Sequence, residues 1–147
     1  IAQLYRRHDV VACPLGPEAS AFVGAWADER GFGPDDADVA ECREAIATTP
    51  LFGLDAVSYL VDGDIAGISL TDHALPNTSI VLFCKVARRL PYLTDAIFQR
   101  IAYALPPDRY LNLCQDLGLD GLRAKKTFLQ PAAIADKYML PATRSGT

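Results

Sequence analysis

The fold is decided by residues 56–70, which read AVSYLVDGDIAGISL. Two runs rich in Val, Tyr, Ile and Leu flank Asp62 and Gly63. An Asp-Gly pair between two such runs is the strongest short-range signal of a β-hairpin, because both residues of its tight turn need positive φ angles. Residues 79–86, SIVLFCKV, form a third run behind a Pro-Asn turn. The sequence therefore predicts a meander of three antiparallel strands, at 56–61, 65–70 and 79–86.

A helix and a further strand follow the meander. Thr94 is a typical N-cap residue for a helix over 95–105, and two prolines stop that helix. Residues 110–114, YLNLC, then read as a strand. A strand, a helix and a strand form a crossover unit, so the new strand is expected to run parallel to an earlier one. This arrangement would bring Asn112 and Asp116 to the carboxyl edge of the sheet, where ligands tend to bind.

The remaining segments predict flanking elements. Residues 9–15 read as an opening strand, and helical periodicity predicts helices over 18–30 and 39–48. The second helix is expected to end there, because the residue before Pro50 is biased away from helical backbone. A last short helix is expected over 131–138, which opens with a proline. We therefore expect an α/β (α+β) fold: a mixed sheet with an antiparallel meander, a crossover helix and flanking helices.

Residues 110–131, YLNLCQDLGLDGLRAKKTFLQP, place a lysine in an apolar stripe. The stripe consists of Leu119, Leu122 and Leu129 at helical spacing, and Lys126 fills the position left for another core residue. One interpretation is a lysine whose carbon stem packs on the stripe while its ammonium reaches water. The other puts the ammonium in a cleft beside the core, where partial desolvation and a bound anion would tune it. Arg123 lies three residues earlier and would point to the same place.

The chain as a whole has the make-up of one folded domain. It has 147 residues, half of them hydrophobic, and no apolar run of the roughly 18 residues needed to span a bilayer. It begins at Ile1 with no signal-peptide pattern, so we expect an excised or trimmed piece of a larger protein. Its four cysteines are widely spaced and its two histidines are isolated, which disfavours metal and disulfide frameworks. Scattered cysteines suggest a reducing compartment, so a cytoplasmic location is expected.

The charges are divided unevenly along the chain. Residues 1–84 carry 4 basic and 13 acidic side chains, a net charge of −9, whereas residues 85–147 carry 10 and 5, a net charge of +5. The basic half is either a local anion-binding face or an ordinary solvated surface. Lys85 stands near the end of the third strand, on the face of Val81 and Phe83 by alternation. It is either a cation that emerges from the covered side of the sheet or edge protection.

The stretch from residue 112 onward carries the most specific pattern. Eight or more fixed residues keep their spacing with no gap, in the order Asn112-x-x-Gln-Asp-Leu-Gly-Leu-x-Gly-Leu-Arg-x-x-Lys126-x-x-x-x-Pro131, followed by Lys137-Tyr138. This pattern closely resembles the signature of the phosphatidylglycerol lysyltransferase C-terminal domain family. Three features upstream also resemble the family: the hairpin at residues 61–67, the strand that ends in Lys85, and a tryptophan, Trp26, in the first helix. The resemblance therefore covers about residues 9–140.

The resemblance implies a lobe with a GCN5-related N-acetyltransferase-like (GNAT-like) fold. Such domains transfer an aminoacyl group from aminoacyl-tRNA to a hydroxyl or amine, on a lipid or a small molecule. The donor ester is already activated, so no metal or organic cofactor is required, and aminoacyl-tRNA is the co-substrate. Members of the family usually carry two tandem lobes, so this chain is expected to be the second lobe of its parent, with the first lobe as partner.

The resemblance also suggests roles for five residues. Lys126 and Arg123 would hold the donor's terminal phosphate or the developing oxyanion, with Lys85 as a third cation across the cleft. Asp116 would orient one of these cations or accept the acceptor's proton, and Asn112 would hydrogen-bond the substrate. The structural alternative for Asp116 and Arg123 is an ion pair that locks the loop.

The sequence also departs from the family pattern and leaves two other functions open. Leu113 and Cys114 stand where the family usually has arginine and glutamate, so substrate recognition could differ. A coenzyme-A-dependent N-acyltransferase needs a glycine-containing phosphate loop, but residues 88–94, RRLPYLT, have no glycine, and Pro91 lacks an N–H group. That function is therefore disfavoured. The remaining alternative is a non-catalytic docking or scaffold lobe that binds an acidic partner or tRNA through its basic half.

Overall fold

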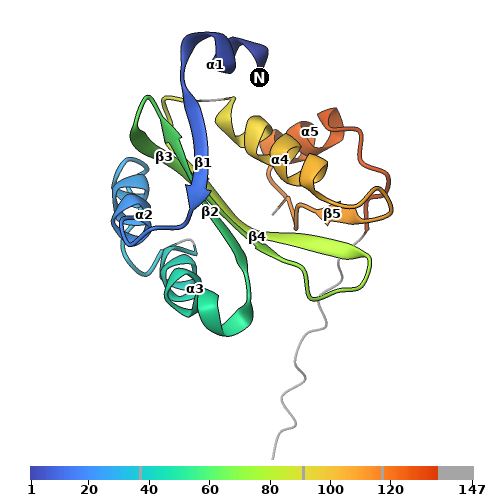
Figure 1. The fold of residues 1–147 in the computed structure, drawn as a ribbon, viewed down its shortest axis with the longest axis horizontal. Helices are drawn as coiled ribbons and strands as arrows, with labels where there is room; N and C mark the ends of the chain where they lie inside the picture. The colour runs from blue at the N-terminus through green and yellow to red at the C-terminus, as the bar shows by residue number, and fades with distance from the viewer. Residues whose placement is uncertain (37, 91, 117, 136–147) are drawn as a thin grey trace, which may run out of the picture. The chain divides into compact units, whose positions relative to one another are not determined.

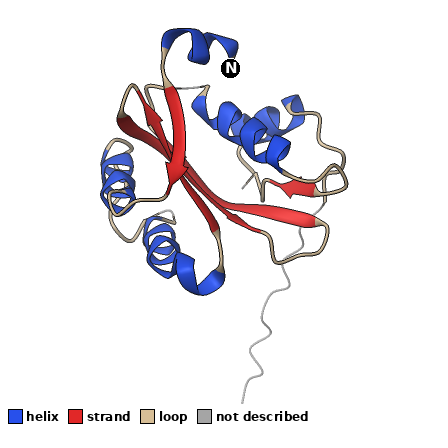
Figure 2. Ribbon diagram, viewed as in Figure 1, coloured by secondary structure: helices blue, strands red, loops and turns tan. Residues whose placement is uncertain are grey.

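The computed structural model describes residues 1–36, 38–90, 92–116 and 118–135. The chain divides into two compact units, Ile1–Cys114 and Gln115–Thr147, which are described separately. The described residues of the first unit form nine elements (Figures 1 and 2): α1 (Ala2–Arg7), β1 (Val10–Pro14), α2 (Ala19–Asp28), α3 (Val39–Phe52), β2 (Asp55–Val61), β3 (Asp64–Asp72), β4 (Thr78–Val86), α4 (Leu93–Ala104) and β5 (Tyr110–Asn112). In the second unit, the described residues form α5 (Asp120–Phe128).

The five strands make one mixed sheet in the order β1-β2-β3-β4-β5. The first four strands pair antiparallel, and β5 pairs parallel with β4 over Thr78–Ile80. The predicted hairpin is confirmed, because Val61 faces Asp64 across a two-residue turn in which Asp62 and Gly63 have φ angles of 55° and 91°. The predicted meander and parallel crossover strand are confirmed as well, and the fold class is α+β.

Helices cover both faces of the sheet, with α2 and α3 on one side and α4 on the other (Figure 1). One core cluster joins the sheet to α4 and to Leu4 of α1, and the other joins it to α2 and α3. Gly67 of β3 explains how α4 comes so close, because a Cβ atom there would lie 3.3 Å from methyl carbons of Ile97 and Leu93. A side chain at position 67 would therefore require these methyl groups to shift by a few tenths of an ångström.

The helix α3 extends further than the sequence predicts. It continues through Pro50 to Phe52 instead of ending at residue 48. The proline lies in the last turns, where it removes one backbone hydrogen bond without stopping the helix. The hydroxyl of Thr49 donates to the carbonyl of Ala45 at 2.8 Å, and Gly53 ends the helix in the left-handed region at a φ angle of 61°.

Two further boundaries differ from the predictions. Thr94 does not cap α4, since the helix already begins at Leu93 with Tyr92 at its N-cap. The buried side chain of Leu93 anchors this first turn in the core. The strand β5 ends at Asn112 instead of residue 114, because Cys114 adopts a φ angle of 59° and its amide donates to Oδ1 of Asn112. The short helix α1 has no counterpart among the predicted elements.

In the second unit, the predicted leucine stripe is not part of a buried core. None of the side chains of α5 is buried, and Leu119, Leu122 and Leu129 are 55%, 39% and 37% exposed. Lys126 therefore does not replace a residue of a buried core, because helical periodicity identifies a face of a helix but not what covers it. The helix predicted over 131–138 is wrong for residues 131–135, which are not helical. Its other residues, Lys137 and Tyr138 among them, lie outside the described part of the chain.

Candidate active site

A tight loop in the second unit brings two of the three predicted catalytic residues, Asp116 and Arg123, into contact. The amide of Leu119 donates to the carbonyl of Asp116, and Gly118 between them has a φ angle of 72°. The Asp116 carboxylate accepts two hydrogen bonds, from the Gly118 amide at 3.0 Å and from Nε of Arg123 at 2.7 Å. The carboxylate thus links the loop to the first turns of α5 and fixes the orientation of the guanidinium.

The same contacts determine the charge state of Asp116. The hydrogen bond from Arg123 is the main cause that lowers the pKa of Asp116, followed by the bond from the Gly118 amide, and the charge of Lys126 adds to the effect. Asp116 is therefore an ionised carboxylate near neutral pH and a weak proton acceptor. Of its two predicted roles, this geometry favours the orientation of a cation over general-base catalysis.

Lys126 is partly buried and lies one turn after Arg123 on α5. The side chains of Arg123 and Asp116 are 68% and 25% exposed. Arg123 in the middle of α5 and Lys126 in its last turn therefore place two cationic groups within electrostatic reach of a fixed carboxylate. This arrangement can bind a phosphate or stabilise a developing oxyanion.

Lys85 and Asn112 belong to the first unit, and each has a structural partner. Lys85 is 6% exposed, its ammonium contacts Asp38 at 2.6 Å, and it lies 4.2 Å from the ring centre of Trp26. Oδ1 of Asn112 accepts the amide of Cys114, which bends the chain out of β5. Lys85 thus links β4 to the start of α3. The predicted binding of substrate by Lys85 and by Asn112 stays a prediction.

The turn between β4 and α4 contains a contact that the sequence does not reveal. The amide of Arg88 donates to the carboxylate of Glu29 at 3.0 Å. Arg30 holds that carboxylate at 3.0 Å, and its other terminal nitrogen donates to the carbonyl of Val86 at 3.0 Å. The Leu90 amide donates to the carbonyl of Ala87. An internal anion therefore occupies the start of this turn. Glu29 lies 59 residues from Arg88, so local sequence patterns carry no signal of it.

A cationic and aromatic stack supports the same region. The guanidinium carbon of Arg30 lies 4.6 Å from the ring centre of Trp26, which also carries the ammonium of Lys85. The four-residue spacing between Trp26 in α2 and Arg30 just after the end of that helix was the one sequence signal that could have found this stack.

Residues 1–36, 38–90, 92–116 and 118–135 contain no group of three or more His, Cys, Asp or Glu side chains that could hold a metal ion. No helix in that part of the chain combines the length and apolar character that a membrane span requires.

Comparison with known proteins identifies the fold. No family model matches the sequence, and no curated protein matches it. A solved structure of a conserved protein of unknown function from Bacteroides thetaiotaomicron VPI-5482 is similar at a TM-score of 0.80 and 21% identity, over 90% of this chain and 48% of that one. A protein of Desulfovibrio desulfuricans named as an acetyltransferase of the GNAT family is similar at a TM-score of 0.62 and 20% identity, over 92% and 91% of the two chains. The chain has a GNAT-like fold.

A third solved structure, the ribosomal-protein-alanine N-acetyltransferase of Brucella melitensis biovar Abortus 2308, is similar at a TM-score of 0.57 and 19% identity, over 95% and 99% of the chains. At such identities the likeness shows the fold and not the reaction. This chain spans about half the length of the Bacteroides protein.

Proposed function

We propose that this chain is an acyltransferase lobe that moves an aminoacyl group from aminoacyl-tRNA to a hydroxyl or amine of a lipid or small molecule. The observation that carries the proposal is the fixed pair of Asp116 and Arg123 beside Lys126, at the residues where the sequence resembles phosphatidylglycerol lysyltransferase C-terminal domains. The GNAT-like fold supports the broader class of acyl transfer.

The proposed reaction needs little beyond positioning and charge stabilisation. The acceptor's oxygen or nitrogen attacks the ester carbonyl of the charged tRNA and forms a tetrahedral intermediate with a negative oxygen. The bond to the terminal ribose oxygen then breaks, and that oxygen takes the proton that the acceptor loses. Arg123 and Lys126 stabilise the negative oxygen or bind the donor's terminal phosphate. Asp116 keeps the guanidinium in place.

The turn between β4 and α4 favours this donor over coenzyme A. A coenzyme A pyrophosphate needs free backbone amides in a glycine-containing loop, where they can converge on its oxygens. Here the Arg88 amide already donates to Glu29, and the Leu90 amide donates to a carbonyl of the turn itself. A carboxylate at the start of the turn would also repel a pyrophosphate.

The second candidate function is coenzyme-A-dependent N-acyl transfer. It is favoured by the structures of similar fold, which are named as acetyltransferases. The two candidates share the acyl acceptor chemistry and differ in the donor. A choice between them therefore depends on which donor binds.

Calorimetric titration of the full-length protein separates the two donors. One titrant is acetyl-CoA and the other is an amide-linked, non-transferable analogue of aminoacyl-tRNA. We expect micromolar binding of the tRNA analogue that weakens in the Arg123→Gln variant, and no heat from acetyl-CoA. Micromolar binding of acetyl-CoA without binding of the analogue would establish the second candidate instead.

A further inference from the structure

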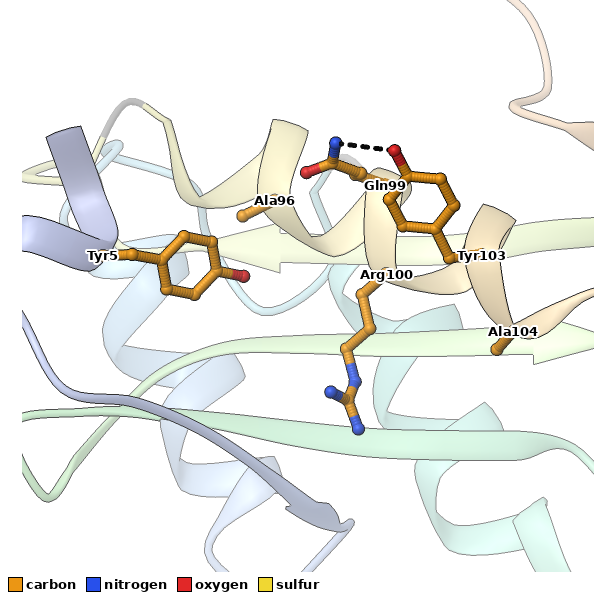
Figure 3. Close-up of a pocket in the computed structure, with 6 residues that line it drawn as sticks. All are labelled: Tyr5, Ala96, Gln99, Arg100, Tyr103 and Ala104. Atoms are coloured by element: carbon orange, nitrogen blue, oxygen red, sulfur yellow. Dashed lines mark hydrogen bonds between the residues drawn. The ribbon is translucent and has the colours of Figure 1, made fainter. Parts of the chain in front are cut away.

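A pocket between α1 and α4 is lined by none of the residues assigned a role above. It has a volume of about 430 Å³ and is lined by Tyr5 of α1 and by one stripe of α4: Ala96, Gln99, Arg100, Tyr103 and Ala104 (Figure 3). Those positions of α4 recur at helical spacing, so they form a continuous wall. The volume falls in the range typical of small-molecule sites.

Arg100 is the charged group of this pocket. Figure 3 shows its side chain reaching from α4 into the space that Tyr5 faces from α1. Among the residues that the structure describes, no carboxylate pairs with Arg100 and no acceptor takes a hydrogen bond from it. Arg109 differs from Arg100 in this respect, because its guanidinium donates hydrogen bonds to Ser79 and to the carbonyl of His73. A guanidinium presents five donors in a planar fork that matches a carboxylate or a phosphate.

The other walls of the pocket suit the body of an organic anion. Tyr5 and Tyr103 are 52% and 81% exposed, so a ligand in the pocket can contact both phenol rings. Nε2 of Gln99 lies 3.4 Å from the hydroxyl of Tyr103 and orients that ring (Figure 3). The two rings and the alanines offer apolar contact along the walls of the pocket.

A smaller cavity of about 20 Å³ continues inward and shares Tyr5, Ala96 and Arg100 with the pocket. Its remaining lining is apolar except for Tyr59, whose hydroxyl contacts Ser69 at 3.2 Å. Burial raises the pKa of Tyr59, and the charge of Arg100 opposes that rise, which places the guanidinium within electrostatic reach of the cavity floor. The pocket therefore has an apolar floor with one cation at its rim.

We infer that the pocket between α1 and α4 is a binding site for a small organic anion, with Arg100 taking its carboxylate or phosphate and Tyr5 and Tyr103 contacting a flat apolar body. None of the acyl-transfer residues lines the pocket, so its occupancy does not require the proposed function to hold. Its ligand is defined by that chemistry: one anionic head group attached to an aromatic or similarly flat frame.

The test is a titration of the isotope-labelled protein followed by NMR, with benzoate, phenyl phosphate and neutral benzamide as probes. We expect both anions to shift the signals of residues 96–104 with a Kd of about 1 mM, the range for fragments of this size, and benzamide to bind at least tenfold more weakly. The tighter of the two anions identifies the preferred head group. Equal binding of benzoate and benzamide would overturn the inference, because the guanidinium would then contribute nothing.

Matched variants localise the effect. Arg100→Gln removes the charge from an exposed helix position and is expected to weaken benzoate binding at least tenfold with the rest of the spectrum unchanged. Arg6→Gln makes the same charge change on α1 at a residue that does not line the pocket, and it should alter the Kd less than twofold. Tyr5→Ala should weaken benzoate more than acetate. Equal losses in Arg100→Gln and Arg6→Gln would contradict the assignment, since they would indicate nonspecific attraction.

Discussion

Nε of Arg123 donates to Oδ2 of Asp116 at 2.7 Å, across seven residues that include a left-handed glycine. This contact joins the loop before α5 to the helix and keeps the guanidinium in one orientation. The sequence alone is compatible with either a structural ion pair or a catalytic role for these two residues. The geometry accommodates both, because a cation that stabilises a transition state acts best when its position is fixed beforehand.

The pKa of Asp116 gives the first test of this contact. It should titrate below its ordinary value of 3.8 in the wild type and rise toward that value in Arg123→Gln, because the hydrogen bond from Arg123 is the main stabiliser of the carboxylate. Lys125→Gln, on the same helix, is the matched control. The pKa is read from the side-chain carbonyl carbon by NMR. An unchanged pKa in Arg123→Gln would mean that the pair does not form in solution.

The lowered pKa of Asp116 determines how the stability of this contact depends on pH. Because the folded-state pKa lies below the unfolded one, the contact contributes stability above the unfolded pKa and loses it as the pH falls through the folded pKa. The order of the Asp116 loop should thus persist through mildly acidic pH and fail only in strong acid. Loss of the loop's NMR signals near pH 6 would contradict this reading.

The buried ion pair of Lys85 and Asp38 predicts an unequal response to removal of its two partners. Asp38→Asn keeps a residue that tolerates the φ angle of 61° but leaves the ammonium buried without a counter-ion, so it should lower the free energy of unfolding by about 2 kcal/mol. Lys85→Met should cost about 1 kcal/mol, because the half-exposed Asp38 is then solvated and the methionine still packs on Trp26. Urea denaturation measures both.

The double variant Lys85→Met with Asp38→Asn is the control for that comparison. It should be no less stable than Asp38→Asn alone, since the uncompensated ammonium is gone. A larger loss for Lys85→Met than for Asp38→Asn would show that packing of the lysine stem, and not its charge pairing, stabilises this region.

Cysteine reactivity offers a test of burial in the α2 and α3 core. Burial raises the pKa of Cys42 to about 11, with the charge of Lys85 opposing the rise, so about one thiol in a thousand is ionised at pH 8. Cys114 is exposed. Labelling with a disulfide reagent, followed by mass spectrometry, should modify Cys114 first and Cys42 last. Simultaneous labelling of the two in the native protein would show that the core opens more easily than this packing implies.

Hydrogen exchange tests the contact between Glu29 and the turn that precedes α4. Glu29→Ala removes the acceptor of the Arg88 amide, so exchange of that amide should accelerate about tenfold. The amide of Leu90 donates to the carbonyl of Ala87 and provides the internal control, with an expected change of less than twofold. An unaltered rate at Arg88 would remove the structural argument against a coenzyme A site in this turn.

Local signals predicted the parts of the fold that depend on neighbouring residues. The hairpin at Asp62 and Gly63 was predictable because two residues alone determine its turn. The parallel β5 followed from the order of elements, since a helical crossover returns a strand in the same direction. The extension of α3 through Pro50 was not predictable, because the cost of a proline depends on how close the helix end lies.

The candidate site was predictable where its contacts are short in sequence. Asp116 and Arg123 lie seven residues apart, and their contact follows from a turn next to a helix. The partners of Lys85 and of the Arg88 amide lie 47 and 59 residues away, and only the folded chain brings them together. Local sequence also led to one wrong prediction. The spacing of Leu119, Leu122 and Leu129 correctly indicated a helix, but the same spacing was not evidence that these leucines are buried.

The most direct measurement is single-turnover transfer by the full-length protein of a radiolabelled amino acid from aminoacyl-tRNA to lipid and small-amine acceptors. We predict label transfer by the wild type, a loss of at least about 100-fold in Arg123→Lys, as expected when one oxyanion donor is removed, and a change of less than twofold in Lys125→Gln. Full transfer by Arg123→Lys, or transfer of label from acetyl-CoA but from no charged tRNA, would contradict the account.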